Sequence, residues 1–347
     1  MNASSSIQPA KPNAAMQAIL DAHTAMGPLP IETLTPEQAR LIPLPDRAAI
    51  AYYGQHFTKK ALAPLPLPVG ETRHLLIPTA EGRLVARLYT PKGEAPEEGW
   101  PLVVYFHGGG WVLANLDTYD ASCRALCNGA EAMVLAVHYR QAPEHPWPAA
   151  MKDAYAAFEW AAAHAPGLDA DPNRIAVAGE SAGGNLAAVV SQIARDKEAQ
   201  LPLHQLLIYP VTDLLHGIES PSAEENAEAR PLNRAMLRWF YGHYVPERED
   251  RSHPYISPLY GETAGLPPAT VILAQIDPLR SDGEAYAVKM AEADVPVTLK
   301  IYEGVTHEFF GMAGLIHEAT DAVALASKEL RQAFDEASRA LADLDVE

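Results

Sequence analysis

The chain of 347 residues is poor in cysteine, with Cys123 and Cys127 as its only thiols. Four residues separate them on an expected helix, which places both on one face, and no second pair is available to complete a metal site. Buried structural thiols are therefore the expected use of both residues. The sequence predicts no metal centre and no cofactor.

Long apolar runs and an excess of basic charge are also absent. No run reaches the roughly 18 apolar residues of a membrane span, and residues 1–6 lack the basic and apolar regions of a secretion signal. Lysine and arginine number 26 against 44 acidic residues, a formal net charge of −18. Nucleic acids and anionic membranes are themselves negative, so the charge argues against both as partners. We expect a soluble, cytoplasmic protein.

Alternating or continuous apolar runs predict the strands. Eight such runs occur, at 72–77, 83–89, 102–106, 132–138, 174–178, 205–209, 270–275 and 297–302. The first two are separated by a short turn and should be antiparallel, whereas most of the later ones are separated by helix-length connections, which join parallel strands. Helical patterns between them would cover both faces. The sequence predicts an α/β fold with an eight-stranded, mostly parallel sheet flanked by helices.

The segment Gly-Glu-Ser-Ala-Gly-Gly at 179–184 lies between a strand pattern and a helix pattern. Glycine two positions before and after Ser181 removes the Cβ atoms that would collide at a sharp strand-to-helix turn. Such a turn exposes the serine Oγ in front of helix N-terminal amides, which stabilise developing negative charge. The motif predicts a nucleophile at Ser181, and a glycine-rich loop without a chemical role is the alternative.

A second glycine-rich segment, His-Gly-Gly-Gly-Trp at 107–111, directly follows the strand pattern 102–106. Successive glycines let backbone N–H groups face a substrate oxygen, and two such donors with the Ala182 amide would bind a tetrahedral oxyanion. A phosphate-binding loop is the competing interpretation. It fails because neither glycine pattern of such loops occurs here with its basic or acidic partner.

A serine nucleophile requires a histidine base and an acid that orients the imidazole. Of the 13 histidines, His307 lies on the loop that directly follows the last strand pattern, so it is the predicted base. Asp277 comes just past the preceding strand pattern and is the preferred acid. Asp282, one helical turn further on, and Asp213, which follows the strand pattern 205–209, remain alternatives.

Together these motifs resemble those of the hormone-sensitive-lipase-like α/β-hydrolases, the bacterial family IV esterases. The resemblance extends from about residue 70 to 315 and includes Asp-Pro-Leu at 277–279 and His-Glu-Phe at 307–309. The chain departs from the motifs of this family at two places. Glu180 stands where aspartate is commoner, and Ser-Asp-Gly at 281–283 stands where two acids are usual. The resemblance implies an α/β-hydrolase fold and the following roles: nucleophile Ser181, acid Asp277, base His307, and oxyanion donors Gly108, Gly109 and Ala182.

Two segments fall outside the strand and helix alternation. The first, residues 1–68, contains helix-like pieces and ends in a proline-rich linker, and the second, at about 214–246, contains an amphipathic pattern. Long insertions commonly cover catalytic sites, so we expect a helical cap on a catalytic domain at 69–347. Peripheral helices that only stabilise the domain are the alternative.

Bulky side chains of the two segments should mostly pack cap against core, and a few should line an acyl pocket. The candidates are Met16, Ile19, Leu20, Tyr52, Tyr53, Phe57, Met236, Trp239, Phe240, Tyr241 and Tyr244.

The expected activity is hydrolysis of a small-molecule carboxylic ester through an acyl-enzyme. The resemblance and usual pocket sizes favour short to medium acyl groups, roughly two to eight carbons. Amides, carbamates and thioesters could react through the same apparatus. A ligand-binding receptor on the same scaffold is one alternative. The presence of a nucleophile, a base and an acid at the expected places argues against it. A long-chain lipase is another, opposed by the acidic balance and the lack of a strongly apolar exposed helix. The sequence leaves a homodimer open.

Overall fold

A computed structural model describes residues 10–56, 66–247 and 249–344. The helices are α1 (Ala14–Ala25), α2 (Pro36–Ala39), α3 (Pro45–His56), α4 (Asp120–Ala130), α5 (Ala149–His164), α6 (Ala182–Asp196), α7 (Pro221–Glu225), α8 (Arg234–Tyr244), α9 (Arg280–Glu292) and α10 (His317–Leu344). Short 3-10 turns occupy Ile31–Thr33, Ala165–Leu168, Gly217–Glu219, Pro258–Tyr260 and Phe310–Met312. The strands are β1 (Glu71–Thr79), β2 (Gly82–Thr90), β3 (Trp100–Phe106), β4 (Met133–His138), β5 (Ala170–Glu180), β6 (Gln205–Ile208), β7 (Ala269–Ile276) and β8 (Val297–Thr306).

All eight strands form one sheet in the order β1-β2-β4-β3-β5-β6-β7-β8. The pairs β1–β2 and β2–β4 are antiparallel, and every pair from β4 to β8 is parallel. The predicted fold class is therefore confirmed. The β5 strand begins at Ala170, earlier than its apolar run suggests, because Ala170 pairs with Trp100 of β3 before the register shifts. The next pair is Leu102 with Ile175, so the extra residues lie on β5.

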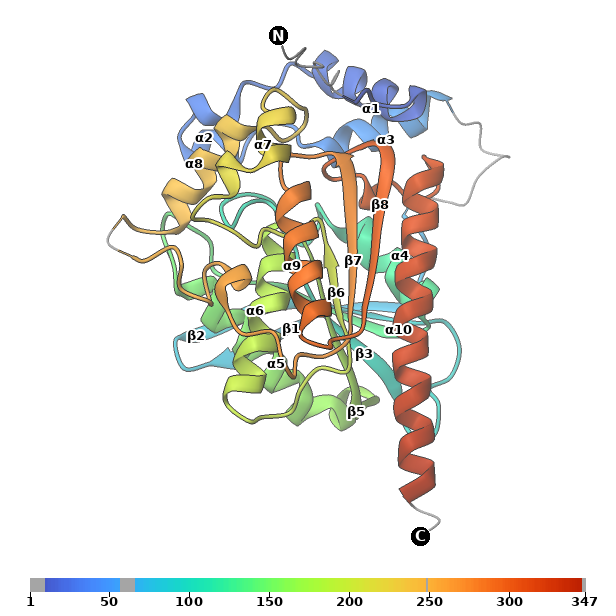
Figure 1. Cartoon of the computed structure of the whole chain (residues 1–347). Coiled ribbons are helices and arrows are strands. Elements are labelled where there is room, and N and C mark those ends of the chain that lie inside the picture. Colours follow the sequence, from blue (N-terminus) through green and yellow to red (C-terminus); the bar gives the residue numbers. More distant parts are fainter. Residues whose placement is uncertain (1–9, 57–65, 248, 345–347) are drawn as a thin grey trace.

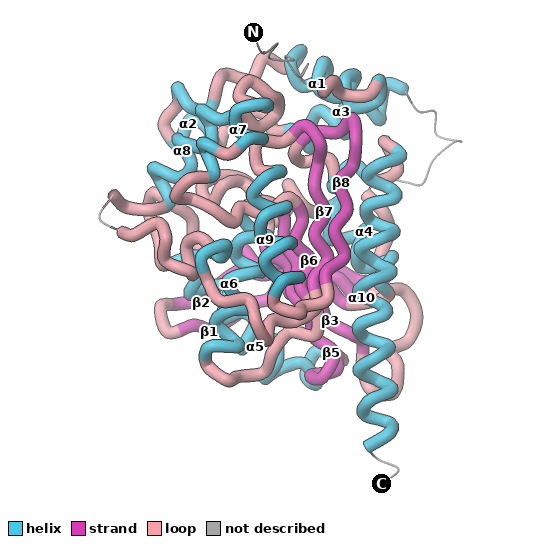
Figure 2. Tube along the Cα trace, in the orientation of Figure 1, coloured by secondary structure: helices cyan, strands magenta, loops and turns pink. Residues whose placement is uncertain are grey.

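Helices cover both faces of the sheet (Figure 2). On β3, the side chains of Leu102, Val104 and Phe106 belong to the core layer beneath α5, α6 and α9. Val103 and Tyr105 alternate with them and belong to the layer beneath α4 and α10. Successive strand residues point to opposite faces, so a strand covered on both sides is apolar throughout.

The α1, α2, α3, α7 and α8 helices gather at one end of the molecule (Figure 1). The amide of Asn13 donates to the Gly304 carbonyl at 2.8 Å, which joins the start of α1 to β8. Asn13 Oδ1 also accepts from the Met16 amide at 2.9 Å and so caps α1. The α1 helix is thereby held over one end of the sheet.

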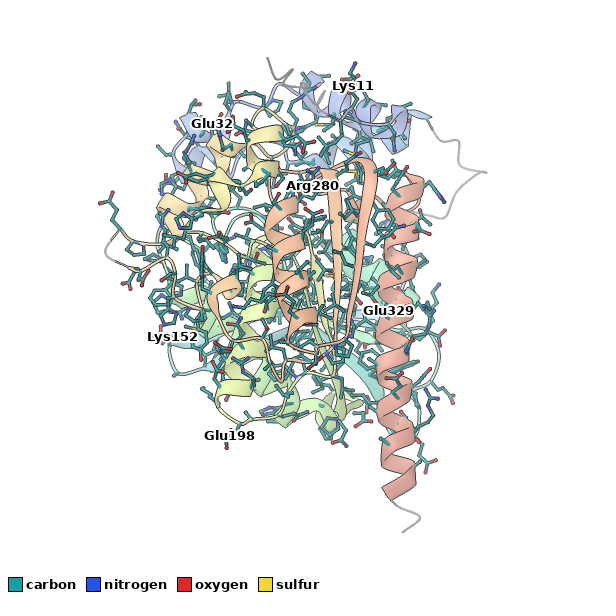
Figure 3. The ribbon with its side chains drawn as sticks, viewed as in Figure 1. Lys11, Glu32, Lys152, Glu198, Arg280 and Glu329 are labelled. Carbon is teal, nitrogen blue, oxygen red and sulfur yellow. The ribbon has the colours of Figure 1, made fainter. Side chains whose placement is uncertain are left out.

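Charged side chains link the outer helices to their neighbours (Figure 3). Arg280, the first residue of α9, binds the Glu225 carboxylate of α7 at 2.5 Å. Glu329 on α10 accepts a hydrogen bond from the Thr298 hydroxyl of β8 at 3.0 Å. No helix in the described part of the chain is long and apolar enough to cross a membrane.

Candidate active site

Ser181 lies at the turn between β5 and α6 with φ 57° and ψ −117°, a conformation that strains a residue with a side chain. A Cβ on Gly179 would collide with the Gly183 carbonyl, and a Cβ on Gly183 would collide with the Phe106 carbonyl. Both glycines are therefore required by close backbone approach. Ser181 was expected to be exposed, but it is only 6% accessible because it lies on the floor of a covered pocket.

Three side chains from separate loops meet at this turn. The Nε2 atom of His307 lies 3.0 Å from Ser181 Oγ, and its Nδ1 atom lies 2.6 Å from Asp277 Oδ2. Asp277 is fully buried, and its other oxygen accepts from the Leu279 amide at 2.9 Å. Because a carboxylate only accepts, the Nδ1 atom carries the ring hydrogen and Nε2 is left to accept from Ser181.

The two alternative acids lie in other surroundings. The Asp213 carboxylate accepts from the amides of Leu215 and His216, both at 2.9 Å, and so caps a turn. Asp282 is buried in the first turn of α9, and burial raises the pKa of its carboxyl well above the usual range. Of the three acids, the structure brings only Asp277 into hydrogen-bond contact with His307.

The glycine-rich loop is oriented by two buried aromatic side chains. The Tyr139 hydroxyl donates to the His107 carbonyl at 2.7 Å, and His107 Nδ1 donates to the Gly108 carbonyl at 2.8 Å. Burial lowers the pKa of His107 to about 3, so its ring is neutral. In a trans peptide the N–H points opposite to the C=O. The amides of Gly108 and Gly109 are therefore directed away from these two side chains, and Gly109 lines the pocket.

The Ala182 amide completes this group of donors. Ala182 is the first residue of α6, and the first amides of a helix have no acceptor within it. The sequence places this N–H next to Ser181, so the helix dipole also favours negative charge at that point.

Glu180 braces the turn from below. Its carboxylate accepts from the Tyr105 hydroxyl at 2.5 Å and from the Tyr209 hydroxyl. Burial raises the pKa of Glu180. The Tyr209 ring also contacts the His307 imidazole, with their centroids 4.5 Å apart. The same acidic residue therefore supports the loops of both Ser181 and His307.

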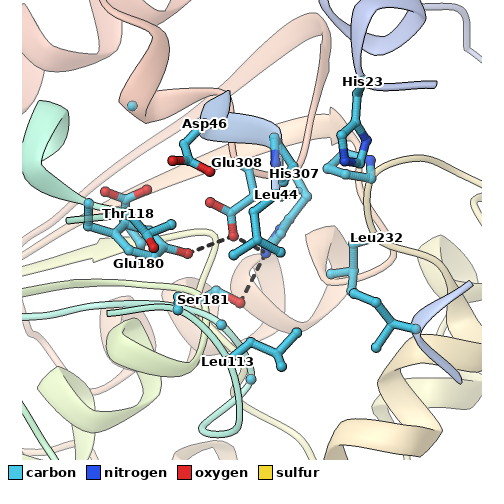
Figure 4. A pocket seen from close by; sticks show the side chains of 18 of the residues that line it. His23, Leu44, Asp46, Leu113, Thr118, Glu180, Ser181, Leu232, His307 and Glu308 are labelled. Carbon is cyan, nitrogen blue, oxygen red and sulfur yellow. Dashed lines mark hydrogen bonds and ion pairs between the residues drawn. The ribbon is translucent and has the colours of Figure 1, made fainter. Parts of the chain in front are cut away.

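A pocket of about 730 Å³ lies above Ser181 and His307 (Figure 4). Of the bulky candidates from the sequence, three on α8 line it: Met236, Phe240 and Tyr241. Met16, Ile19 and Leu20 of α1 lie in the core, which is the use expected for most of the candidates. Residues after α1 line it instead, among them Ile31, Ile42 and Leu44. Phe57 and the Tyr53 side chain lie outside the described residues.

Two pocket residues were not singled out by the sequence patterns. The Tyr119 hydroxyl donates to Glu308 Oε1 at 2.7 Å, and the same oxygen lies 3.9 Å from His307 Nε2. For Glu308, its place directly after the predicted base was the only available signal. Among the described residues, no group of three or more His, Cys, Asp or Glu side chains is arranged to hold a metal ion.

Comparison with known proteins identifies the family. A family model described as the alpha/beta hydrolase fold matches residues 103–311. The chain belongs to this family and to its hormone-sensitive-lipase-like group, as its motifs indicated.

Two curated relatives from Mycobacterium tuberculosis and one solved structure illustrate the likeness. Carboxylic ester hydrolase LipN is 44% identical over 69% of this chain and 64% of its own length, so less than two thirds of LipN is matched. Carboxylesterase NlhH is 41% identical over 72% of this chain and 78% of its own. The structure of LAE6, an α/β-hydrolase enzyme from the metagenome of Lake Arreo in Spain, superposes with a TM-score of 0.83. It is 35% identical and covers 93% of this chain and 98% of its own.

Proposed function

We propose that this protein is a serine carboxylesterase that acts through an acyl-enzyme, with Ser181 as nucleophile, His307 as base and Asp277 as acid. The observation that supports this most directly is the hydrogen-bonded series from Ser181 Oγ through the imidazole to Asp277, at 3.0 and 2.6 Å. The relatives named as carboxylesterases support the same reaction class. A receptor without catalysis would have no need of this series.

In the first half-reaction, His307 Nε2 takes the Ser181 proton as Oγ attacks the ester carbonyl carbon. The carbonyl oxygen becomes negative and is held by the amides of Gly108, Gly109 and Ala182. The imidazolium then gives its proton to the departing alcohol oxygen, which leaves an acyl group on Oγ. Water repeats the attack with His307 again as base, and the carboxylic acid is released.

The acyl group would occupy the pocket above Ser181. Its lining combines residues of the N-terminal segment, such as Ile31 and Leu44, with Met236 and Leu237 of α8. Their shared contribution to the pocket wall supports the proposal that residues 1–68 and about 214–246 act as a cap. Each buried methylene contributes about 0.8 kcal/mol until the pocket is full. We therefore propose a preference for acyl groups of roughly two to eight carbons.

A series of chromogenic esters from two to sixteen acyl carbons tests the proposal, with Ser181→Ala as the matched control. We expect kcat/KM to rise and then fall within the series, and the variant to lose on the order of a thousandfold in kcat. Undiminished turnover by Ser181→Ala would overturn the nucleophile. A specificity constant that rises up to the longest chain would favour a lipase, and ester binding without turnover would favour a receptor.

A further inference from the structure

Glu308 has an unusual backbone and an unusual position. Its φ is 70°, in the left-handed region that a non-glycine residue adopts at a cost. β8 ends at Thr306, and the chain then turns so that the side chains of His307 and Glu308 both line the pocket of Ser181 (Figure 4). Consecutive strand residues would point to opposite faces, so this turn is what brings them together.

The Glu308 carboxylate is held in place from the other side of the pocket. Its Oε1 atom accepts from the Tyr119 hydroxyl at 2.7 Å. Tyr119 is 4% exposed, and a Cβ on Gly108 would collide with its hydroxyl, so the ring lies tightly beneath the glycine-rich loop. An exposed carboxylate would move among many rotamers, whereas this one is fixed with Oε1 3.9 Å from His307 Nε2.

We propose that Glu308 is a positioning residue that acts through His307: its carboxylate stabilises the imidazolium from the Nε2 side while Asp277 does so from Nδ1. This inference rests on the proposed function, because the imidazolium forms only if His307 accepts the Ser181 proton. Glu308 makes and breaks no bond. Its negative charge favours the protonated, positively charged imidazole ring of His307. This positive charge develops in the transition state, as Ser181 attacks the ester.

The electrostatics of the site agree with this geometry. Burial alone would lower the pKa of His307, but the facing carboxylates of Asp277, Glu308 and Glu180 outweigh it and raise that pKa. Burial, Glu180 and Asp46 of α3 raise the pKa of Glu308 to about 7, against the opposing effects of His307 and the hydrogen bond from Tyr119. Because the Glu308 carboxyl and the His307 imidazole influence each other's pKa, the acid limb of the pH profile belongs to the pair.

The decisive variant is Glu308→Gln, which keeps the shape of the side chain and removes its charge. Without the carboxylate, the imidazole loses its proton more readily. The acid limb of kcat/KM should therefore move to lower pH by about one unit, and the plateau should fall roughly tenfold. A merely structural role would lower activity at every pH and leave the limb in place.

Two further variants complete the experiment. Tyr119→Phe releases the carboxylate but keeps its charge, so we expect a smaller shift in the same direction and little additional effect of Tyr119→Phe in the Glu308→Gln background. Glu303→Gln, the same change at an exposed position of β8, is the matched control and should leave the profile unchanged. Thermal unfolding of each variant identifies any that fail to fold.

An unchanged acid limb in folded Glu308→Gln would overturn the inference, as would an equal shift in Glu303→Gln. The proposed function is tested separately by Ser181→Ala. If that variant remains active, the nucleophile is wrong. If it is inactive and the limb of Glu308→Gln does not move, only the role of Glu308 is wrong.

Discussion

Arg40, the residue after α2, ties the N-terminal segment to the loops beside the site, and its replacement gives the most demanding test of this structure. Its Nε donates to the Val112 carbonyl at 2.9 Å and its NH2 group to the Ala142 carbonyl at 2.8 Å. The guanidinium also holds both oxygens of Glu144, at 2.7 and 2.8 Å. Val112 follows the glycine-rich loop, so the contact joins segments 72 residues apart in sequence.

The expected loss in Arg40→Ala follows from these contacts. A hydrogen bond from a charged donor contributes about 1.5 kcal/mol or more, and two carbonyls lose theirs. The Glu144 side chain is 48% exposed, so the ion pair adds at most about 1 kcal/mol. We expect the free energy of unfolding to fall by about 3 kcal/mol. For a chain of this length, that is a decrease of roughly 4 °C in Tm.

Urea and thermal unfolding measure this loss, and Glu144→Gln is the matched control. The control weakens the ion pair but leaves both carbonyl contacts, so it should cost less than about 1 kcal/mol. If the N-terminal segment detaches before the core unfolds, protease cleavage within residues 26–45 should increase in Arg40→Ala alone. Equal losses in the two variants, or a loss below about 1 kcal/mol in Arg40→Ala, would refute the reasoning.

Three other predictions concern the site and its cover. Asp277→Asn should lower kcat on the order of 10³-fold or more, and Asp282→Asn should be milder, because of these two acids only Asp277 contacts His307. If steady-state kinetics showed the larger loss in Asp282→Asn, the assignment of the acid would be wrong. Burial raises the pKa of Asp46 to about 6, so folding favours its protonated form and stability is lost as pH rises from about 4 to 6. Asp46→Asn should accordingly raise the free energy of unfolding by up to about 3 kcal/mol at pH 8 and change it little at pH 4. Urea unfolding measures both values, and an equal effect at the two pH values would contradict this prediction. Gly110 has φ 60° and a Cβ there would collide with the Phe240 ring of α8, so Gly110→Ala should lower both Tm and kcat, and normal values of both would be incompatible with this close contact.

The strands and the serine turn could be predicted because their determinants are local. Alternation and apolar runs specify which segments lie in a covered sheet, since side-chain direction in a strand depends only on position along it. The glycines around Ser181 are required by backbone atoms within a few residues or on the neighbouring β3 strand. The order of strands also indicated where Asp277 and His307 would emerge, because the carboxyl ends of parallel strands share one edge of the sheet.

Other features were decided only by tertiary packing. The sequence left three candidates for the acid that orients His307. Only the packing of the loops brings one of them, Asp277, into contact with the imidazole. Tyr119 and Glu308 are 189 residues apart, and no periodic pattern relates them. The wall of the pocket likewise depends on how α1 lies against β8, which buries Met16 and leaves Ile31 at the cavity. Local patterns determine the direction of a side chain from its own backbone, whereas its partner across a pocket depends on how distant segments pack together.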